Sequence, residues 1–237
     1  MVIHEFLHRV RRKLVKLRLR PIRVFCFHQV SDTFDENTMY HEDWLQTEDF
    51  KGEVLKLTNQ GYSFISLPEA YQKLKHDIFR FYKYAVLTAD DGDASLRNVL
   101  PWLNEQKIPV TLFLNPMYID GKHFRNRNTE RYLSEADLKQ FSDIFPLLSI
   151  GSHGWAHVDS YKQTEQEFKE SIIRSDEYLK SFPNYIPFFA YPYGRCTYSA
   201  YKETIKQKVV PVLVRGNKNI KYDGYIDREL FKSTNET

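Results

Sequence analysis

The chain has 237 residues, of which 42% are hydrophobic and 15% are aromatic. This composition excludes a disordered chain and predicts a globular protein, most simply one domain with a substantial core. The formal net charge of +3 is too small to indicate nucleic-acid binding. Cys26 and Cys196 are too few for a disulfide framework, so we expect both thiols to be buried and reduced.

The first 20 residues hold a concentrated positive charge. Seven Lys and Arg residues occur from Arg9 to Arg20, with no acidic residue among them. Apolar residues at spacings of three and four form one stripe on this segment, namely Ile3, Leu7, Val10, Leu14 and Leu17. The pattern predicts a basic amphipathic helix over residues 1–20, followed by one domain over residues 21–237. Such a helix could lie on an anionic membrane surface or cover the bottom of a barrel, and the pattern fits both.

No apolar run in the sequence has the length of a membrane span or of the core of a secretory signal. We therefore expect a cytoplasmic protein without a signal peptide. Peripheral contact with the inner face of the membrane, through residues 1–20, is compatible with this location.

Beyond residue 21, aromatic and β-branched runs alternate with helical patterns. Strands are predicted at residues 23–30, 64–67, 84–87, 110–114, 147–151, 187–194 and 209–214. Helices are predicted at residues 47–59, 95–106, 134–145 and 197–206, and two more open near residues 68 and 164. Ser134 and Thr164 each begin a capping-box pattern, whereas Pro101 interrupts the helical pattern around it. The alternation predicts an α/β fold of parallel units, and about seven strands favour a distorted (β/α) barrel over an open sheet.

Residues 84–93 read Tyr-Ala-Val-Leu-Thr-Ala-Asp-Asp-Gly-Asp. The first half resembles a buried strand, so Asp90 and Asp91 should emerge at its C-terminal end, where α/β folds bind ligands. Two adjacent ionised carboxylates repel each other, and a cation or a proton would relieve that repulsion. The pair predicts a metal site with a neighbouring acid or base. A strand that ends in an ordinary polar Asp-Gly turn is the alternative.

A pair of histidines follows another predicted strand. His153 and His157 lie four residues apart, a spacing that lets two imidazoles face one centre. Alone, the pair is weak evidence, because partly exposed histidines are common. Together with Asp91 it forms a two-histidine, one-carboxylate set, which leaves positions on a divalent ion open for water and substrate.

Three segments, taken together, resemble the leading motifs of the polysaccharide deacetylases, carbohydrate esterase family four. They are residues 88–92 (Thr-Ala-Asp-Asp-Gly), 152–157 (Ser-His-Gly-Trp-Ala-His) and 189–194 (Phe-Ala-Tyr-Pro-Tyr-Gly). The resemblance depends on their order and spacing and extends over about residues 21 to 229. It implies a distorted (β/α) barrel, in agreement with the strand count.

The resemblance also implies a metal-dependent enzyme. The divalent ion, zinc or another first-row metal, would be bound by Asp91, His153 and His157. Asp90 would be the general base that takes a proton from the attacking water. An acetamide resists hydrolysis, so the ion would be needed to polarise its carbonyl and to lower the pKa of water.

The third motif is implied to bind the substrate. Tyr193 would offer its backbone N–H to the oxyanion, an interaction worth roughly 3 to 4 kcal/mol in comparable sites. The ring of Tyr193, together with Pro192 and Trp155, would line the groove for an acetylated glycan.

The sequence departs from the commonest family pattern at three places. The last histidine is His157, so the usual C-terminal acid motif is missing. His28, in residues 27–30 (Phe-His-Gln-Val), resembles the early motif of the poly-N-acetylglucosamine deacetylase branch and is our candidate acid; a structural histidine at a strand end is the alternative. Ala89 stands where Phe is usual, and Ala190 replaces an arginine that steadies the base. Arg228 is the candidate substitute, with a surface ion pair as its alternative.

The expected function is removal of N-acetyl groups from N-acetylhexosamine units of a polysaccharide or its precursor, by hydrolysis of a linear amide C–N bond. O-Acetyl esterase activity would use the same groups. Two other readings remain at this point. Asp91 and Asp93 mimic the Asp-x-Asp signature of metal-dependent glycosyltransferases, and Ala89 with Ala190 would suit a non-catalytic relative that binds acetylated glycans.

Overall fold

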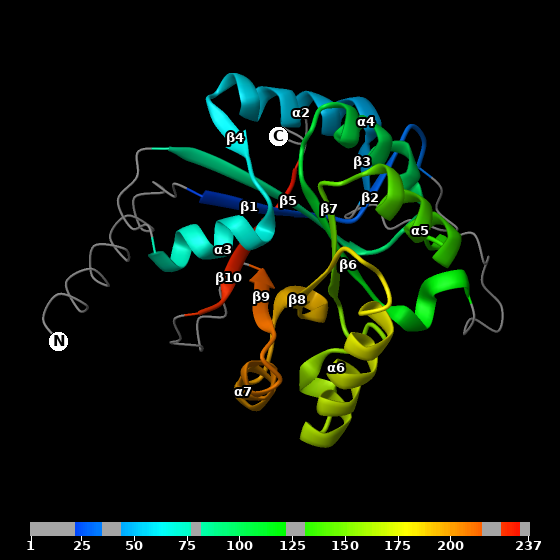
Figure 1. Cartoon of the computed structure of the whole chain (residues 1–237), viewed down its shortest axis with the longest axis vertical. Coiled ribbons are helices and arrows are strands. Elements are labelled where there is room, and N and C mark those ends of the chain that lie inside the picture. Colours follow the sequence, from blue (N-terminus) through cyan, green and yellow to red (C-terminus); the bar gives the residue numbers. More distant parts are fainter. Residues whose placement is uncertain (1–21, 35–43, 77–81, 122–130, 215–223, 233–237) are drawn as a thin grey trace, which may run out of the picture.

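Seven parallel strands pair in a closed ring. In chain order they are β1 (Ile22–Phe27), β5 (Lys83–Asp91), β6 (Val110–Leu114), β7 (Leu148–Ser152), β8 (Tyr185–Ala190), β9 (Val210–Val214) and β10 (Ile226–Leu230). Neighbours in the ring run β1-β10-β9-β8-β7-β6-β5, and β5 pairs with β1 to close it. Figure 1 shows these strands in the middle of the molecule, with the helices around them. The prediction of a distorted (β/α) barrel with about seven parallel strands is confirmed.

The computed structural model describes residues 22–34, 44–76, 82–121, 131–214 and 224–232. The predicted basic helix over residues 1–20, with its membrane contact, lies outside them. Within these described ranges, no helix is both long enough and apolar enough to cross a membrane.

The distortion of the barrel involves the long strand β5. Its first half pairs with β4 (Tyr62–Phe64) and its second half with β6, so β4 belongs to the sheet without belonging to the ring. Two more short strands, β2 (Gln29–Ser31) and β3 (Trp44–Gln46), form a separate sheet. The predicted strand at residues 64–67 overlaps β4 only at Phe64, and the seventh member of the ring is β10. Three of the five residues of β10 are charged, so its sequence does not have the pattern of a barrel strand.

The helices follow the predicted order. They are α2 (Thr47–Asn59), α3 (Leu67–His76), α4 (Leu100–Glu105), α5 (Glu135–Ile144), α6 (Glu165–Leu179) and α7 (Tyr198–Lys206). Short 3₁₀ turns are η2 (Ala94–Asn98), η3 (Pro116–Gly121), η5 (Ser160–Lys162) and η6 (Pro192–Gly194). Both predicted capping boxes form, at Ser134 and Thr164. The helix predicted over residues 95–106 divides into η2 and α4, because Pro101 lacks an N–H and fits only the first turn of a helix.

The inside of the barrel changes from apolar to polar along the strands. Alternate residues of the ring strands gather in one apolar cluster, which includes Val24, Val86, Phe113, Phe188, Val212 and Ile226. Successive side chains of a strand point to opposite faces, so residues two positions further on face the same side. On β1, β5 and β10 these are Cys26, Thr88 and Arg228, which are buried and polar or ionisable. The polar layer therefore lies toward the C-terminal ends of the strands.

Candidate active site

The predicted site residues lie at one end of the barrel. Asp90 and Asp91 close β5, and His153 follows β7 directly. His28 follows β1, and Tyr193 follows β8. Parallel strands bring their C-terminal ends to the same end of a barrel, and this is the end where barrel enzymes hold their catalytic groups.

The structure brings the three predicted metal ligands together. Asp91 Oδ1 lies 3.4 Å from His153 Nε2 and 3.4 Å from His157 Nε2. The donor atoms of the three side chains all lie within 4.8 Å of one another. This spacing allows one ion to touch all three.

The hydrogen bonds around this group indicate that it suits a cation. His153 Nδ1 lies 2.7 Å from the carbonyl oxygen of Ala190, which can only accept, so Nδ1 carries the hydrogen and Nε2 offers a lone pair. Burial lowers the pKa of His153 to about 4, which keeps the imidazole neutral. Asp91 Oδ1 is buried and has no hydrogen-bond partner among the described residues. A divalent ion would satisfy the carboxylate oxygen and both imidazoles at once.

The backbone is strained at two positions of the predicted site. Asp91 has φ 68° and Tyr193 has φ 61°, in the left-handed region that residues with a Cβ rarely adopt. Such outliers persist only where surrounding contacts enforce them, and they gather at functional sites. In this conformation Asp91, the last residue of β5, lies within 3.4 Å of both imidazoles.

Asp90 is held by a planar fork from β10. Arg228 Nη1 donates to Asp90 Oδ1 at 2.6 Å and Nη2 donates to Oδ2 at 2.7 Å, with both side chains buried. Burial raises the pKa of Asp90, but the charge of Arg228 and the nearby His153 outweigh it and hold that pKa below its ordinary value. The carboxylate therefore stays ionised inside the barrel.

Arg228 is itself fixed from two sides. Its Nη1 also donates to Thr88 Oγ1 at 2.9 Å, and that hydroxyl donates to the carbonyl of Phe25 at 2.8 Å. Its guanidinium carbon lies 5.2 Å from the ring centre of Phe113. The surface ion pair considered as the alternative does not describe this residue, whose side chain is fully buried.

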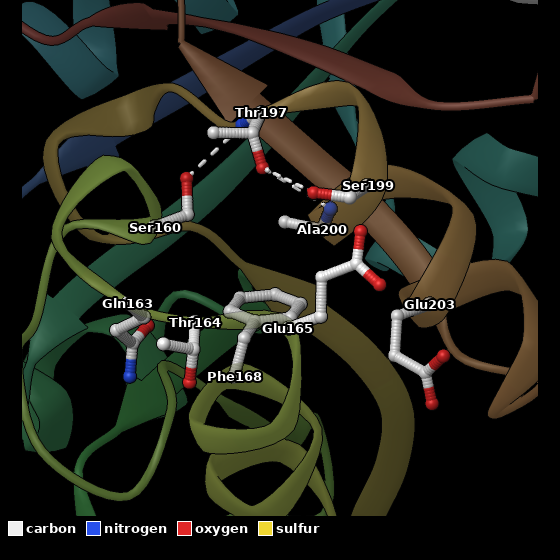
Figure 2. Close-up of a pocket in the computed structure, with 9 residues that line it drawn as sticks. All are labelled: Ser160, Gln163, Thr164, Glu165, Phe168, Thr197, Ser199, Ala200 and Glu203. Atoms are coloured by element: carbon white, nitrogen blue, oxygen red, sulfur yellow. Dashed lines mark hydrogen bonds between the residues drawn. The ribbon is translucent and has the colours of Figure 1, made fainter.

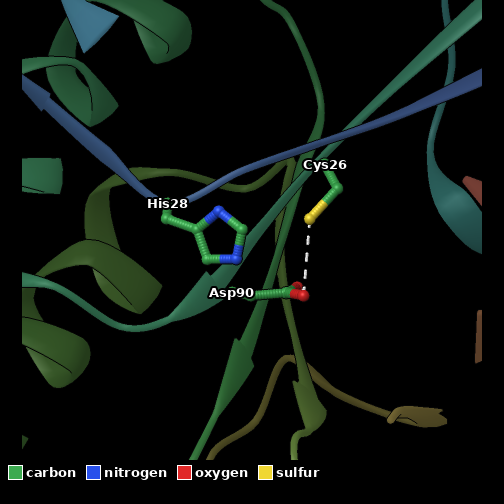
Figure 3. Close-up of side chains that lie close together, drawn as sticks. All are labelled: Cys26, His28 and Asp90. Carbon is green, nitrogen blue, oxygen red and sulfur yellow. Dashed lines mark hydrogen bonds between the residues drawn. The ribbon is translucent and has the colours of Figure 1, made fainter. Parts of the chain in front are cut away.

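His28 and a thiol lie beside Asp90 (Figure 3). The donor atoms of Cys26, His28 and Asp90 lie within 4.8 Å of one another, and Cys26 Sγ is 3.4 Å from Asp90 Oδ2. The sequence predicted the place of His28 but not that of Cys26 in this group. The signal that could have found it is the alternation along β1, because Cys26 precedes His28 by two residues.

The third-motif residues have different surroundings. Tyr193 is 63% exposed, and its ring lies against His157, with 4.7 Å between ring centres. Pro192 is buried beside it. The indole of Trp155 instead packs on α6, with Arg174 3.7 Å from its ring centre. The role of Trp155 in substrate binding stays a prediction.

A buried amide supports the loop between the histidines. Asn115 Nδ2 donates to the carbonyl of His153 at 2.6 Å and to that of Gly154 at 3.1 Å. The hydroxyl of Tyr118 accepts from the backbone N–H of His157 at 3.3 Å. Asn115 was not among the predicted site residues. Its position directly after β6, at the same end of the barrel, was the available signal.

Asp93 does not join the site. Its Oδ1 accepts from the N–H of Ser95 at 2.9 Å, and its Oδ2 accepts from Gln29 Nε2 at 2.9 Å. The carboxylate thus caps η2 and ties β2 to it. The Asp-x-Asp interpretation, which needs Asp93 on a metal and a nucleotide diphosphate, is not favoured by this arrangement.

A small polar pocket lies between the N-terminal ends of α6 and α7 (Figure 2). Its lining consists of Ser160, Gln163, Thr164, Glu165, Phe168, Thr197, Ser199, Ala200 and Glu203. None of these residues belongs to the metal group, so this pocket is distinct from the predicted centre.

Comparisons with known proteins agree with this geometry. Residues 82–210, more than half of the chain, match the model of the polysaccharide deacetylase family. The chain is similar in structure to IcaB from Ammonifex degensii, with 24% identity and a TM-score of 0.73 over 89% of this chain and 91% of that one.

Two further solved structures have the same fold. The deacetylase PplD from Streptococcus pyogenes is 20% identical, with a TM-score of 0.72 over 90% of this chain and 93% of that one. A de-N-acetylase from Aggregatibacter actinomycetemcomitans is 17% identical, with a TM-score of 0.72 over 90% and 95%. The search of curated proteins gave no match. The extent of the family match, with the barrel and the placement of its motifs, shows that the chain belongs to the polysaccharide deacetylase family, whose enzymes remove acetyl groups from glycans.

Proposed function

We propose that this enzyme hydrolyses the N-acetyl groups of N-acetylhexosamine units in a polysaccharide or its precursor, with the help of a divalent ion. The observation that carries the proposal is the convergence of Asp91, His153 and His157 beside an arginine-paired Asp90. Zinc is the first candidate, because two imidazoles and one carboxylate are a donor set typical of catalytic zinc.

Each side chain has a defined task in this proposal. Asp91, His153 and His157 would hold the ion, which would supply a Lewis acid for the acetyl carbonyl and for the attacking water. Asp90 accepts the proton of the attacking water. Arg228 keeps Asp90 ionised and oriented, since its two parallel N–H bonds leave the carboxylate one plane to adopt.

The remaining two tasks fall to His28 and Tyr193. His28 lies beside the base Asp90, with their donor atoms within 4.8 Å of each other, and we assign it the protonation of the departing amine. Tyr193 offers its backbone N–H to the oxyanion, and its left-handed conformation sets the direction of that N–H.

His28 and Arg228 lie outside residues 82–210, the part that matches the family model. Their positions support assignment to the poly-N-acetylglucosamine deacetylase branch, in which an early histidine serves as the acid. The structural likeness to a de-N-acetylase agrees with an amide substrate.

The test combines metal analysis with acetate release from N-acetylglucosamine oligomers. Asp90→Asn should retain the metal and lose turnover, because the base is lost and the ligand group is kept. Asp91→Ala should lose both, and His28→Ala should keep the metal and lower kcat. Full activity after complete removal of metal, or a fully active Asp90→Asn variant, would overturn the proposal. An O-acetylated glycan assayed in parallel distinguishes amide from ester specificity.

A further inference from the structure

An exposed shelf of side chains adjoins the metal group, and of this shelf only the backbone N–H of Tyr193 has a task in the proposed chemistry. It consists of Tyr161, Tyr193 and Arg195, and we call it the aromatic shelf. Tyr161 is 54% exposed, and the side chain of Arg195 is 60% exposed. Large side chains left in water at a functional site are candidates for ligand contact.

A buried carboxylate positions this shelf. Asp159 is only 2% exposed, and its Oδ2 accepts from Arg195 Nη2 at 2.6 Å and from Arg195 Nε at 3.2 Å. Its Oδ1 accepts from the backbone N–H of Tyr161 at 3.0 Å. One carboxylate therefore places both the guanidinium and the tyrosine backbone, and the hydrogen bond from Arg195 raises the pKa of that guanidinium.

Two more hydrogen bonds join the segments that carry the shelf. The backbone N–H of Thr197 donates to Ser160 Oγ at 3.1 Å, as Figure 2 shows. The hydroxyl of Tyr161 donates to the carbonyl of Cys196 at 3.3 Å, and the guanidinium carbon of Arg195 lies 5.3 Å from the Tyr161 ring centre. The ring of Tyr161 is thus held in place before any ligand arrives, which reduces the entropy lost on binding.

The shelf is continuous with the predicted reacting centre. The ring of Tyr193 contacts His157, and Arg195, two residues further along the chain, lies against the ring of Tyr161. These contacts connect the imidazole of His157 with Tyr193 and, through Arg195, with Tyr161. A polymeric substrate bound at the centre would have its next unit over these residues.

We propose that the aromatic shelf is a second sugar subsite, which binds the hexosamine ring next to the unit that loses its acetyl group. This inference rests on the proposed function. The face of a tyrosine ring can pack against the C–H groups of a pyranose, and the outer N–H groups of Arg195 can donate to its hydroxyl or acetamido oxygens. A ring on one side and a polar donor on the other match the amphipathic surface of a sugar.

Tyr161→Ala is the main test, with two acetylated probes. One probe is the tetramer of N-acetylglucosamine, and the other is 4-nitrophenyl acetate, which has no neighbouring sugar ring. The ratio of kcat/KM for the tetramer to kcat/KM for the ester should fall about 3- to 10-fold, mainly through a higher KM for the tetramer. Tyr161→Phe should restore most of the ratio, because the ring remains.

Tyr198→Ala is the matched control, since Tyr198 is an equally exposed tyrosine on α7 outside the shelf. It should leave the ratio unchanged. An unchanged ratio in Tyr161→Ala, or an equal fall in Tyr198→Ala, would reject the subsite.

A binding measurement separates this inference from the proposed chemistry. In the Asp90→Asn background, calorimetry with the tetramer should show a Kd about 3- to 10-fold weaker when Tyr161 is also changed to Ala. That result supports the subsite even if the wild type releases no acetate. Equal affinities in the two proteins would reject the subsite while leaving the proposed hydrolysis intact.

Discussion

At the scale of single residues, the pairing of Arg228 with Asp90 is the contact with the largest consequences. Both groups are buried, and a buried charge is tolerated when its partner satisfies it with good geometry. The guanidinium provides two parallel N–H bonds that an ammonium group cannot reproduce. The same contact serves stability and chemistry, because it balances the negative charge of the ionised Asp90 and also orients the carboxylate.

Arg228→Met should destabilise the fold by about 3 to 5 kcal/mol, because Asp90 is left buried without its partner. Arg228→Lys should be milder, with the charge kept and the fork lost. Urea unfolding at neutral pH measures both. Arg23→Met is the control, since Arg23 of β1 pairs at 2.7 Å with Glu229, the neighbour of Arg228 on β10, and both side chains are about one third exposed. A solvent-accessible pair of this kind is worth up to about 1 kcal/mol. Equal losses for Arg228→Met and Arg23→Met would contradict this account.

At the scale of secondary-structure elements, the start of α5 is tied to the segment that follows the aspartate strand. Asp137 completes the capping box with Ser134 and also accepts two bonds from Arg97 of η2, at 2.9 and 2.7 Å. The N–H of Leu133 donates to the carbonyl of Gly92 at 2.8 Å. The helix cap therefore helps to fix the loop that begins at Asp91.

The stability that Asp137 contributes to this cap should depend on pH. The hydrogen bond from Arg97, followed by those from Ser134, lowers the pKa of Asp137 below its ordinary value of about 3.9. The ionised carboxylate thus stabilises the fold above about pH 4, and this contribution is lost as the pH falls further toward the lowered pKa. Asp137→Asn should cost about 1 to 2 kcal/mol at pH 7.

Urea unfolding at about pH 7 and pH 3.5 tests this expectation. The free energies of unfolding of the wild type and of Asp137→Asn should differ less at the lower pH. Glu167→Gln, at the same position of the capping box of α6, is the control. Glu167 bonds to Thr164 at the surface, and the change should have a smaller effect. If the wild type and Asp137→Asn differed by the same free energy of unfolding at both pH values, the role given to the carboxylate charge would be contradicted.

At the scale of the whole molecule, β10 closes the barrel. It pairs with β1 on one side and with β9 on the other, and the N–H of Phe231 donates to the carbonyl of Cys26 at 2.8 Å. The ring of Phe231 packs on Phe25 and Phe50, with centres 5.2 and 5.3 Å away. The strand that closes the ring is therefore also the strand that carries Arg228 to the site.

A chain that ends at Gly224 should fail to fold cooperatively, because β1 and β9 would be left with unpaired edges. A chain that ends at Lys232 is the control and should retain its thermal transition within a few degrees. Circular dichroism and size-exclusion chromatography measure the outcome. Arg228→Met, which keeps β10, separates loss of the strand from loss of the charge. A folded monomer that ends at Gly224 would refute the closure role.

Patterns within short segments allowed much of this molecule to be predicted from sequence. Capping boxes at Ser134 and Thr164, the turn after Asp91, and the spacing of His153 and His157 all depend on residues a few positions apart. Local preferences act over that range, so the strands, helices and metal group could be expected. The parallel arrangement then placed the aspartates and histidines at one end of the barrel.

Tertiary structure alone decided the rest. β10 belongs to the ring because it pairs with β1, about 200 residues earlier in the chain, and with β9, about 15 residues earlier. No pattern within a short segment indicates such pairing. The bonds from Arg228 and Cys26 to Asp90, and the clamp of Asp159 on Arg195, join segments distant in sequence. Such contacts form only when the closed barrel brings the strand ends together. The sequence thus determined which groups are present, and barrel closure determined which of them meet.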